Sequence, residues 1–173
     1  VNFTEHGFNR ETRCSDDLVI GSKGKFIFVS IDSGFTWEAI FIEGLAKVQN
    51  TFRTQEGSIL VGGPDDSNEE LNRIVRVRDG KLLESNLVGL NCWHGTFSID
   101  EHDGIIMFSE YPTNRKTQEN HVPASVFKSA DDGRSWQSVF TMDFPEIRHF
   151  HTCTALQNGE WLVTSGDSPN QCR

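Results

Sequence analysis

The sequence lacks the features that mark several large classes of protein. No apolar run approaches the roughly 18–20 residues that a membrane-spanning helix needs, so no such helix is expected. The four cysteines form no Cys-x-x-Cys pair and lie far apart, at Cys14, Cys92, Cys153 and Cys172. This spacing argues against a structural zinc site and against a dense disulfide scaffold, whereas a single disulfide stays an open alternative.

Positive charge is also scarce. Lys and Arg number 16 against 25 Asp and Glu, which gives the chain a formal net charge of -9. Because the basic residues form no cluster, the chain is a poor candidate for binding the phosphate backbone of nucleic acid. The same charge balance argues against adhesion to anionic membranes.

Helical signals are nearly absent from the 173 residues. No long apolar stripe with a 3.6-residue period occurs, and no convincing capping box precedes one. Hydrophobic residues make up 36% of the chain and gather in short runs between turn-forming residues. The composition therefore predicts a globular, strand-rich protein with enough apolar side chains for a core.

Two octapeptides repeat each other 99 residues (129 minus 30) apart. Residues 30–37 and residues 129–136 both fit the pattern Ser-x-Asp-x-Gly-x-(Thr/Ser)-Trp. Strand-like runs precede them at 25–29 and 125–128 and follow them at 38–41 and 137–140. The pattern predicts two copies of a strand, a tight turn and a second strand.

The residue types in this octapeptide have a local physical explanation. A short Asp side chain can accept hydrogen bonds from backbone N–H groups of its own turn. The Gly allows a positive φ without a Cβ clash, and the Trp buries a large ring between neighbouring sheets. Asp32 and Asp131 are the residues that would accept these turn hydrogen bonds.

A second repeat marks another kind of strand. Its copies are residues 17–21, 58–62, 104–108 and 160–164. Residues 73–83 keep a hairpin pattern but lack the octapeptide. Short strands, many turns and a period near 50 residues predict a β-propeller with four-stranded antiparallel blades, in preference to a β-sandwich.

The predicted blades divide the chain into about three and a half units. Their approximate limits are 1–43, 44–88, 89–143 and a partial unit at 144–173. A closed propeller has roughly four to eight blades. The chain is therefore expected to be an arc of a larger ring of six or seven blades.

The paired octapeptides resemble the Asp boxes, or BNR repeats, of sialidase-like propellers. The blade pattern covers most of the chain, while the sharp motif is confined to the two octapeptides. This family includes sialidases, other glycosidases, sorting receptors and photosystem assembly factors, so the resemblance implies a fold more than an activity. In the family the Asp box lies on a turn remote from the catalytic face, so the resemblance implies that Asp32 and Asp131 are structural rather than catalytic.

The segment from Gly104 to Asp167 is also similar to uncharacterised bacterial Asp-box propellers. Its matching elements are Ser109-Glu110-Tyr111, the octapeptide at Ser129, Arg148-His149-Phe150-His151 and Gly166-Asp167. Sialidases carry three arginines and a Phe/Tyr-Arg-Ile-Pro motif. Residues 144–148 do not form that motif and no arginine triad can be assembled, so sialidase activity itself is not expected.

Ligands of propellers meet the mouth of the channel, where two sets of loops converge. The loops ahead of the predicted innermost strands contain His6, Trp93, His94, Arg148, His149 and His151. Three or four imidazoles around one axis could hold a divalent metal or act as general acids and bases. The alternative is that each histidine hydrogen-bonds a neighbouring turn and stabilises its blade.

Carboxylates follow two of the predicted second strands, at Glu110 and Asp167. With His149 and His151 they are the candidate catalytic groups, since a glycosidase needs two carboxyl groups about 5–5.5 Å or 6.5–9.5 Å apart. The structural alternatives are a salt bridge for Glu110 and an Asx turn for Asp167. Adjacent side chains on a strand point to opposite sides, so Glu110 and Tyr111 are not expected to act as a direct pair.

The candidate substrate-binding residues are Trp93, His94, Tyr111 and Arg148. Arg148 could hold a carboxylate through two hydrogen bonds. The resemblance implies a carbohydrate-active propeller, and we expect a glycoside hydrolase. The alternatives are a non-catalytic propeller that binds a glycan or a protein, and a polysaccharide lyase that uses a divalent metal on the histidines. No other cofactor is expected.

Overall fold

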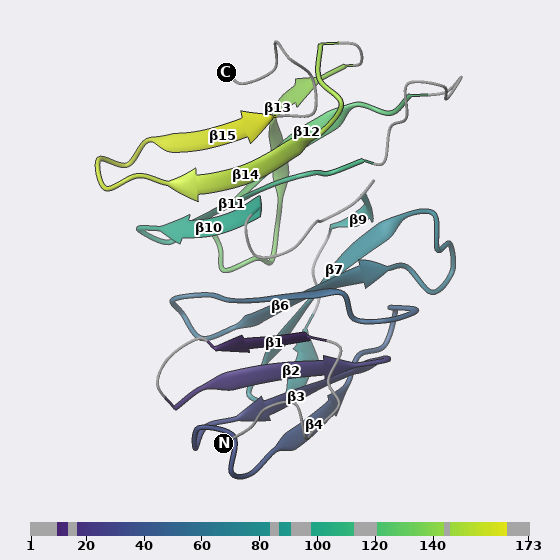
Figure 1. Ribbon diagram of the computed structural model, residues 1–173, viewed down its shortest axis with the longest axis vertical. Coiled ribbons are helices and arrows are strands. Elements are labelled where there is room, and N and C mark those ends of the chain that lie inside the picture. Colours follow the sequence, from purple (N-terminus) through teal and green to yellow (C-terminus); the bar gives the residue numbers. More distant parts are fainter. Residues whose placement is uncertain are drawn as a thin grey trace.

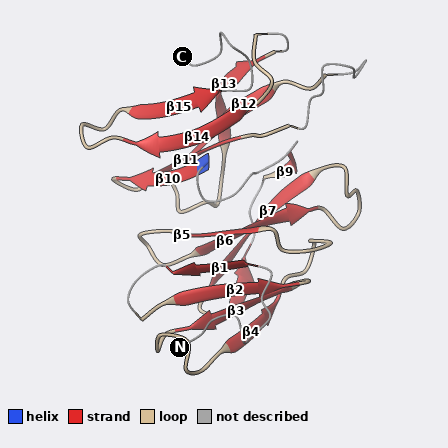
Figure 2. Cartoon of the chain, viewed as in Figure 1, coloured by secondary structure: helices blue, strands red, loops and turns tan. Residues whose placement is uncertain are grey.

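The computed structural model describes residues 10–13, 17–83, 87–90, 98–112, 121–143 and 146–165. These residues form strands and connecting turns, without an α-helix among them; the short blue segment before β10 in Figure 2 is a 3₁₀ turn at Ser98. The described part of the chain accordingly contains no helix with the length and apolar character needed to cross a membrane.

The strands form four antiparallel sheets that follow one another along the chain (Figure 1). The first sheet has β1 (Arg10–Arg13), β2 (Val19–Lys23), β3 (Phe26–Ser30) and β4 (Glu38–Phe41). The second has β5 (Asn50–Arg53), β6 (Ile59–Pro64), β7 (Asn72–Arg78), β8 (Lys81–Leu83) and β9 (Val88–Leu90), which pairs with β7. The third has β10 (Ile99–His102), β11 (Ile105–Ser109), β12 (Ala124–Ser129) and β13 (Gln137–Met142). The fourth has β14 (Phe150–Ala155) and β15 (Trp161–Ser165).

Tight turns set the register of neighbouring strands. Asp79 and Gly80 both have positive φ, of 50° and 71°, and so do Asp103 and Gly104, of 49° and 73°. Two central residues with positive φ match the twist of a hairpin, and Asp-Gly is a favoured pair for this conformation. These turns connect β7 to β8 and β10 to β11 in chain order.

Successive sheets pack face to face through three apolar clusters. The first cluster joins the first and second sheets, the second joins the second and third, and the third joins the third and fourth. Strand β6 contributes side chains to two of these clusters, because Val61 belongs to the first cluster and Leu60 to the second. Successive side chains on a strand point to opposite faces. This explains why β6 is buried along its whole length.

The prediction of an all-β chain built from antiparallel sheets in sequence order is confirmed. The strands also lie close to their predicted positions. Residues 25–29, 58–62 and 104–108, for example, correspond to β3, β6 and β11. The arrangement of these sheets as blades of a ring stays a prediction.

Candidate functional site

The two octapeptides form turns between β3 and β4 and between β12 and β13. We call residues 30–37 the first turn and residues 129–136 the second turn. In the first turn, Asp32 accepts hydrogen bonds from the backbone N–H and the hydroxyl of Thr36, at 2.8 and 2.6 Å. The Ser30 hydroxyl donates to Asp32 at 2.7 Å and accepts from the Gly34 N–H at 2.8 Å. The indole of Trp37 donates to the Gly34 carbonyl at 3.0 Å.

The second turn repeats each of these bonds. Asp131 accepts from the backbone N–H and hydroxyl of Ser135 at 2.9 and 2.6 Å, and from the Ser129 hydroxyl at 2.9 Å. The Trp136 indole donates to the Gly133 carbonyl at 3.1 Å. Gly34 and Gly133 both have positive φ, of 92° and 76°. The predicted local roles of the Asp and the Gly are therefore confirmed.

Hydrogen bonding within the turns also sets the charge state of the two carboxyl groups. The hydroxyl and backbone N–H of Thr36, followed by the Ser30 hydroxyl, lower the pKa of Asp32 to about 2. Burial would raise the pKa of Asp131, but the hydrogen bonds from Ser135 and Ser129 outweigh it and lower that pKa. Both groups are ionised at neutral pH, and their lone pairs are directed into their own turns.

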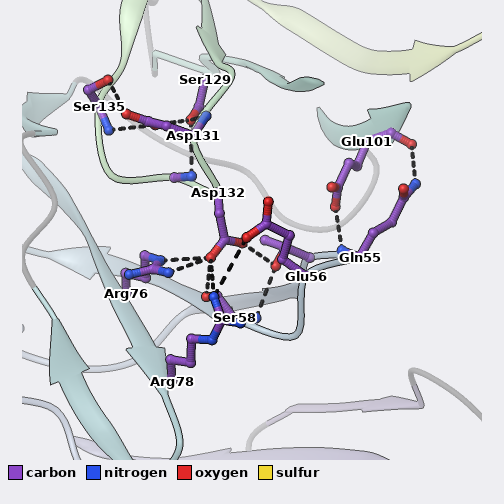
Figure 3. Close-up of polar contacts among 12 residues, drawn as sticks. Gln55, Glu56, Ser58, Arg76, Arg78, Glu101, Ser129, Asp131, Asp132 and Ser135 are labelled. Atoms are coloured by element: carbon purple, nitrogen blue, oxygen red, sulfur yellow. Dashed lines mark hydrogen bonds and ion pairs between the residues drawn. The ribbon is translucent and has the colours of Figure 1, made fainter. Parts of the chain in front are cut away.

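The residue after Asp131 has a role that the repeat does not indicate. Asp132 adopts a φ of 58° and inserts its carboxylate into the second sheet (Figure 3). There it accepts hydrogen bonds from the hydroxyls of Thr54 and Ser58. Arg76 donates to the same carboxylate from Nε, at 3.1 Å, and from Nη2. The carboxylate thus binds the third sheet to the second.

This buried cluster favours an ionised Asp132. Burial alone would raise the pKa of Asp132, but hydrogen bonds from Ser58, Thr54 and Arg76 and the charge of Arg76 together lower it. The matching position in the first turn is Ser33, whose hydroxyl donates to Asp17 at 3.4 Å. The octapeptide leaves this position open, so its sequence pattern does not distinguish the two turns.

A second polar link joins the same two sheets beside this cluster. The backbone N–H of Gln55, in the turn between β5 and β6, donates to Oε2 of Glu101 on β10 at 2.7 Å (Figure 3). Burial raises the pKa of Glu101, and the nearby carboxylates of Asp132 and Glu56 add to this effect. At the same sheet interface the pKa of Asp132 is therefore lowered, whereas the pKa of Glu101 is raised.

The segment after β11 lies against the segment before β14. Glu110 and Tyr111 follow β11, and Arg148 and His149 precede β14. The backbone N–H of Phe150 donates to the Glu110 carbonyl at 3.2 Å, which ties the two segments together. Residues that are far apart in the sequence thus form one site.

Three rings gather at this junction, and we call Tyr111, His149 and His151 the ring cluster. Tyr111 stacks on His149 with ring centroids 3.6 Å apart and planes 18° apart. His151 packs edge-on against both, with centroids 5.5 Å from Tyr111 and 4.9 Å from His149. His149 is buried, while Tyr111 and His151 are half-buried. The cluster therefore has a fixed inner ring and two rings that reach the surface.

The contact of His149 with the backbone selects its tautomer. Its Nδ1 lies 3.3 Å from the carbonyl oxygen of Pro112. Because a carbonyl oxygen only accepts, the proton of this bond is on Nδ1. In the neutral ring the lone pair is then on Nε2.

Glu110 is buried beside the ring cluster but has a different partner. Its Oε2 accepts from the backbone N–H of Ser125 on β12 at 3.0 Å. Its own backbone N–H donates to the Ser125 carbonyl at 2.9 Å, which extends the pairing of β11 with β12. The side chains of Glu110 and Tyr111 thus have separate surroundings.

The structure describes only some of the remaining predicted site residues. Arg148 is half-buried immediately before His149. Four predicted site residues lie outside the described residues: His6, Trp93, His94 and Asp167. The distance between Glu110 and Asp167 is therefore outside the described structure as well. Within the described ranges, no group of three or more His, Cys, Asp or Glu side chains is arranged to hold a metal ion.

No sequence pattern indicates that Asp132 pairs with Arg76, but the position of Arg76 is itself unusual. Arg76 interrupts the apolar run from Ile74 to Val77, where a charged side chain at an inward position would require a buried partner.

Comparison of the sequence with protein-family models gives no match, and a search of curated proteins gives none either.

Proposed function

We propose that this chain is part of an Asp-box β-propeller that acts on carbohydrate, and that the site is the ring cluster together with Glu110. The propeller arrangement is supported by four antiparallel sheets that pack face to face in chain order. It is further supported by two turns that share the same set of hydrogen bonds. Repetition of one supersecondary unit is the basis of propeller folds.

The observation that carries the proposed site is the junction of the two loops. It gathers a carboxyl group, a phenol and two imidazoles from segments on two different sheets. In a glycoside hydrolase, Glu110 would act as one carboxyl group and Asp167, two residues beyond the end of β15 in the sequence, as the other. The half-buried His151 would hydrogen-bond a sugar hydroxyl, and the ring of Tyr111, held by stacking on the buried His149, would contact an apolar sugar face.

The test is a screen of the full chain against aryl glycosides and polysaccharides, with Glu110→Gln as the variant. The amide oxygen of Gln can still accept from the Ser125 N–H, so the strand pairing is kept while acid–base chemistry is lost. Hydrolysis should fall by a factor of about 10² or more. Glu43→Gln is the matched control, because Glu43 is exposed in the turn after the first sheet. Equal rates for the wild type and Glu110→Gln would remove Glu110 from the mechanism.

A non-catalytic propeller that binds a glycan is the second candidate, and one contact favours it. The Glu110 carboxylate is buried and bonded to the backbone of β12, which is a structural role in itself. In this case the chain would bind a glycan without turnover. Tyr111→Ala would weaken that binding, and Glu110→Gln would leave it unchanged.

A further inference from the structure

A pocket opens beside the second turn, away from the ring cluster. Its volume is about 290 Å³, and its lining residues are Lys128, Ala130, Asp131, Ser135, Trp136 and Gln137. The Glu110 site contacts β12 near its start, at Ser125, whereas this pocket lies at the end of the same strand. The volume is close to the lower limit of about 300 Å³ that is typical of small-ligand sites.

The groups that line the pocket differ in how far they are already engaged. Asp131 and Ser135 bond to each other within the turn. Trp136 uses its only polar atom on the Gly133 carbonyl. Its half-buried ring packs against Phe108 of the second apolar cluster and also lines the pocket. Lys128 and Gln137 face each other across β12 and β13, which places their side chains on the same face of the sheet. Among the described residues, Lys128 forms no ion pair.

The first turn provides an internal comparison for these residues. Its equivalent of Ala130 is Ile31, a large side chain that is 76% exposed, and its equivalent of Gln137 is Glu38. The equivalent of Lys128 is Val29. The two turns share their hydrogen bonds but differ in these three lining positions. Compared with the first turn, the second turn therefore has a smaller side chain at Ala130, an amide in place of a carboxylate at Gln137 and an additional cation at Lys128.

We propose that this pocket binds a sugar unit that bears a carboxylate, such as a hexuronic acid. Lys128 pairs with the carboxylate, Gln137 hydrogen-bonds the hydroxyls, and the ring of Trp136 packs against the apolar face of the sugar. The small side chain of Ala130 leaves the space that the sugar ring occupies. The proposal is independent of hydrolysis at Glu110, because the two sites share no residue.

The test is a titration of the ¹⁵N-labelled full chain with D-glucuronate, with D-glucose as the uncharged control. The reporter is the indole N–H signal of Trp136, assigned by its loss in Trp136→Phe. The signal should shift and saturate with glucuronate. Lys128→Ala should weaken the binding of glucuronate roughly tenfold, as expected for loss of a charged hydrogen bond. No shift with glucuronate, or an equal response to glucose, would overturn the proposal.

A steric variant makes the test independent of charge. Ala130→Ile inserts the residue that the first turn has at this position, and the site is exposed, so the turn should fold as the first turn does. The variant should abolish the Trp136 shift, while the matched control Ile31→Ala in the first turn should leave it unchanged. A Trp136 shift that persists in Ala130→Ile would place the ligand elsewhere. Tighter binding of a glucuronate oligomer would assign the site to a polysaccharide, and equal binding would assign it to a free sugar acid; both support carboxylate recognition.

Discussion

Arg76 and Asp132 form a buried ion pair that joins the second sheet to the third. Their side chains are 3% and 2% exposed, and the carboxylate has two hydroxyl donors as well as the guanidinium. A buried charge costs much free energy unless it is paired and hydrogen-bonded. The pair therefore favours one arrangement of the two sheets, because any slip between them would leave a charge without its partner.

The first prediction concerns removal of this carboxylate. Asp132→Ala should lower the free energy of unfolding by about 3–5 kcal/mol, because it leaves the guanidinium of Arg76 buried without its ion-pair partner. Urea denaturation followed by tryptophan fluorescence measures the effect. Asp66→Ala is the matched control, since Asp66 pairs with Lys25 at 3.6 Å on the surface. That variant should change the stability by about 1 kcal/mol or less, and equal losses for both variants would contradict the prediction.

The second prediction concerns the pH dependence of the same pair. The folded-state pKa of Asp132 is lowered, so the unfolded state binds more protons between the two pKa values and stability falls as the pH falls. The contribution is complete above the unfolded pKa of about 3.9 and is lost as the pH drops through the folded value. The difference in unfolding free energy between the wild type and Asp132→Asn should therefore be constant near neutral pH and shrink in acid. A difference that grows in acid would contradict the assigned direction.

The third prediction concerns the glycine of the second turn. A Cβ on Gly133 would lie 2.5 Å from Cδ2 of Leu60, and the residue has a φ of 76°. Gly133→Ala should destabilise the protein by more than the backbone cost of roughly 1–2 kcal/mol, because Leu60 must also move within its core. Gly104→Ala is the control, with a φ of 73° and nothing within 4 Å of its Cβ. Thermal unfolding of both variants compares the two costs, and similar Tm losses would argue against the steric contact.

The fourth prediction concerns the ring cluster. Tyr111 is the only tyrosine in the chain, so selective labelling of tyrosine gives a single set of ring signals. Stacking on His149 should shift these signals upfield in the NMR spectrum. His149→Ala should abolish the upfield shift, whereas His149→Phe should keep much of it while losing the bond to the Pro112 carbonyl. An unchanged Tyr111 spectrum in His149→Ala would show that the two rings are not stacked in solution.

Several local features of this fold could be predicted because short segments encode them. The Ser-x-Asp-x-Gly-x-(Thr/Ser)-Trp pattern contains, within eight residues, the donors and acceptors of the hydrogen bonds that the two turns share. Asp-Gly pairs such as Asp103-Gly104 likewise specify a hairpin from two adjacent residues. The strand positions followed from the same turns and from short apolar runs between them.

The candidate site was predictable only as a set of loops. Glu110, Tyr111, His149 and His151 were selected because the loops after β11 and before β14 were expected to meet, and the Phe150–Glu110 hydrogen bond joins them. The stacking of Tyr111 on His149 and the bond from Ser125 to Glu110 were not foreseen. These contacts depend on the side-chain directions of segments that are far apart in the chain.

The antiparallel strands, the two matching turns and the order of the sheets can be predicted from the amino-acid sequence. Each of these depends on hydrogen bonds and turn conformations among residues that are close in sequence. The pairing of Asp132 with Arg76, 56 residues away, and the stacking of His149 on Tyr111 depend instead on how the folded sheets pack. The physical reason is that a pairing between sheets depends on which faces pack together, and the apolar clusters that bring the faces together involve the whole chain.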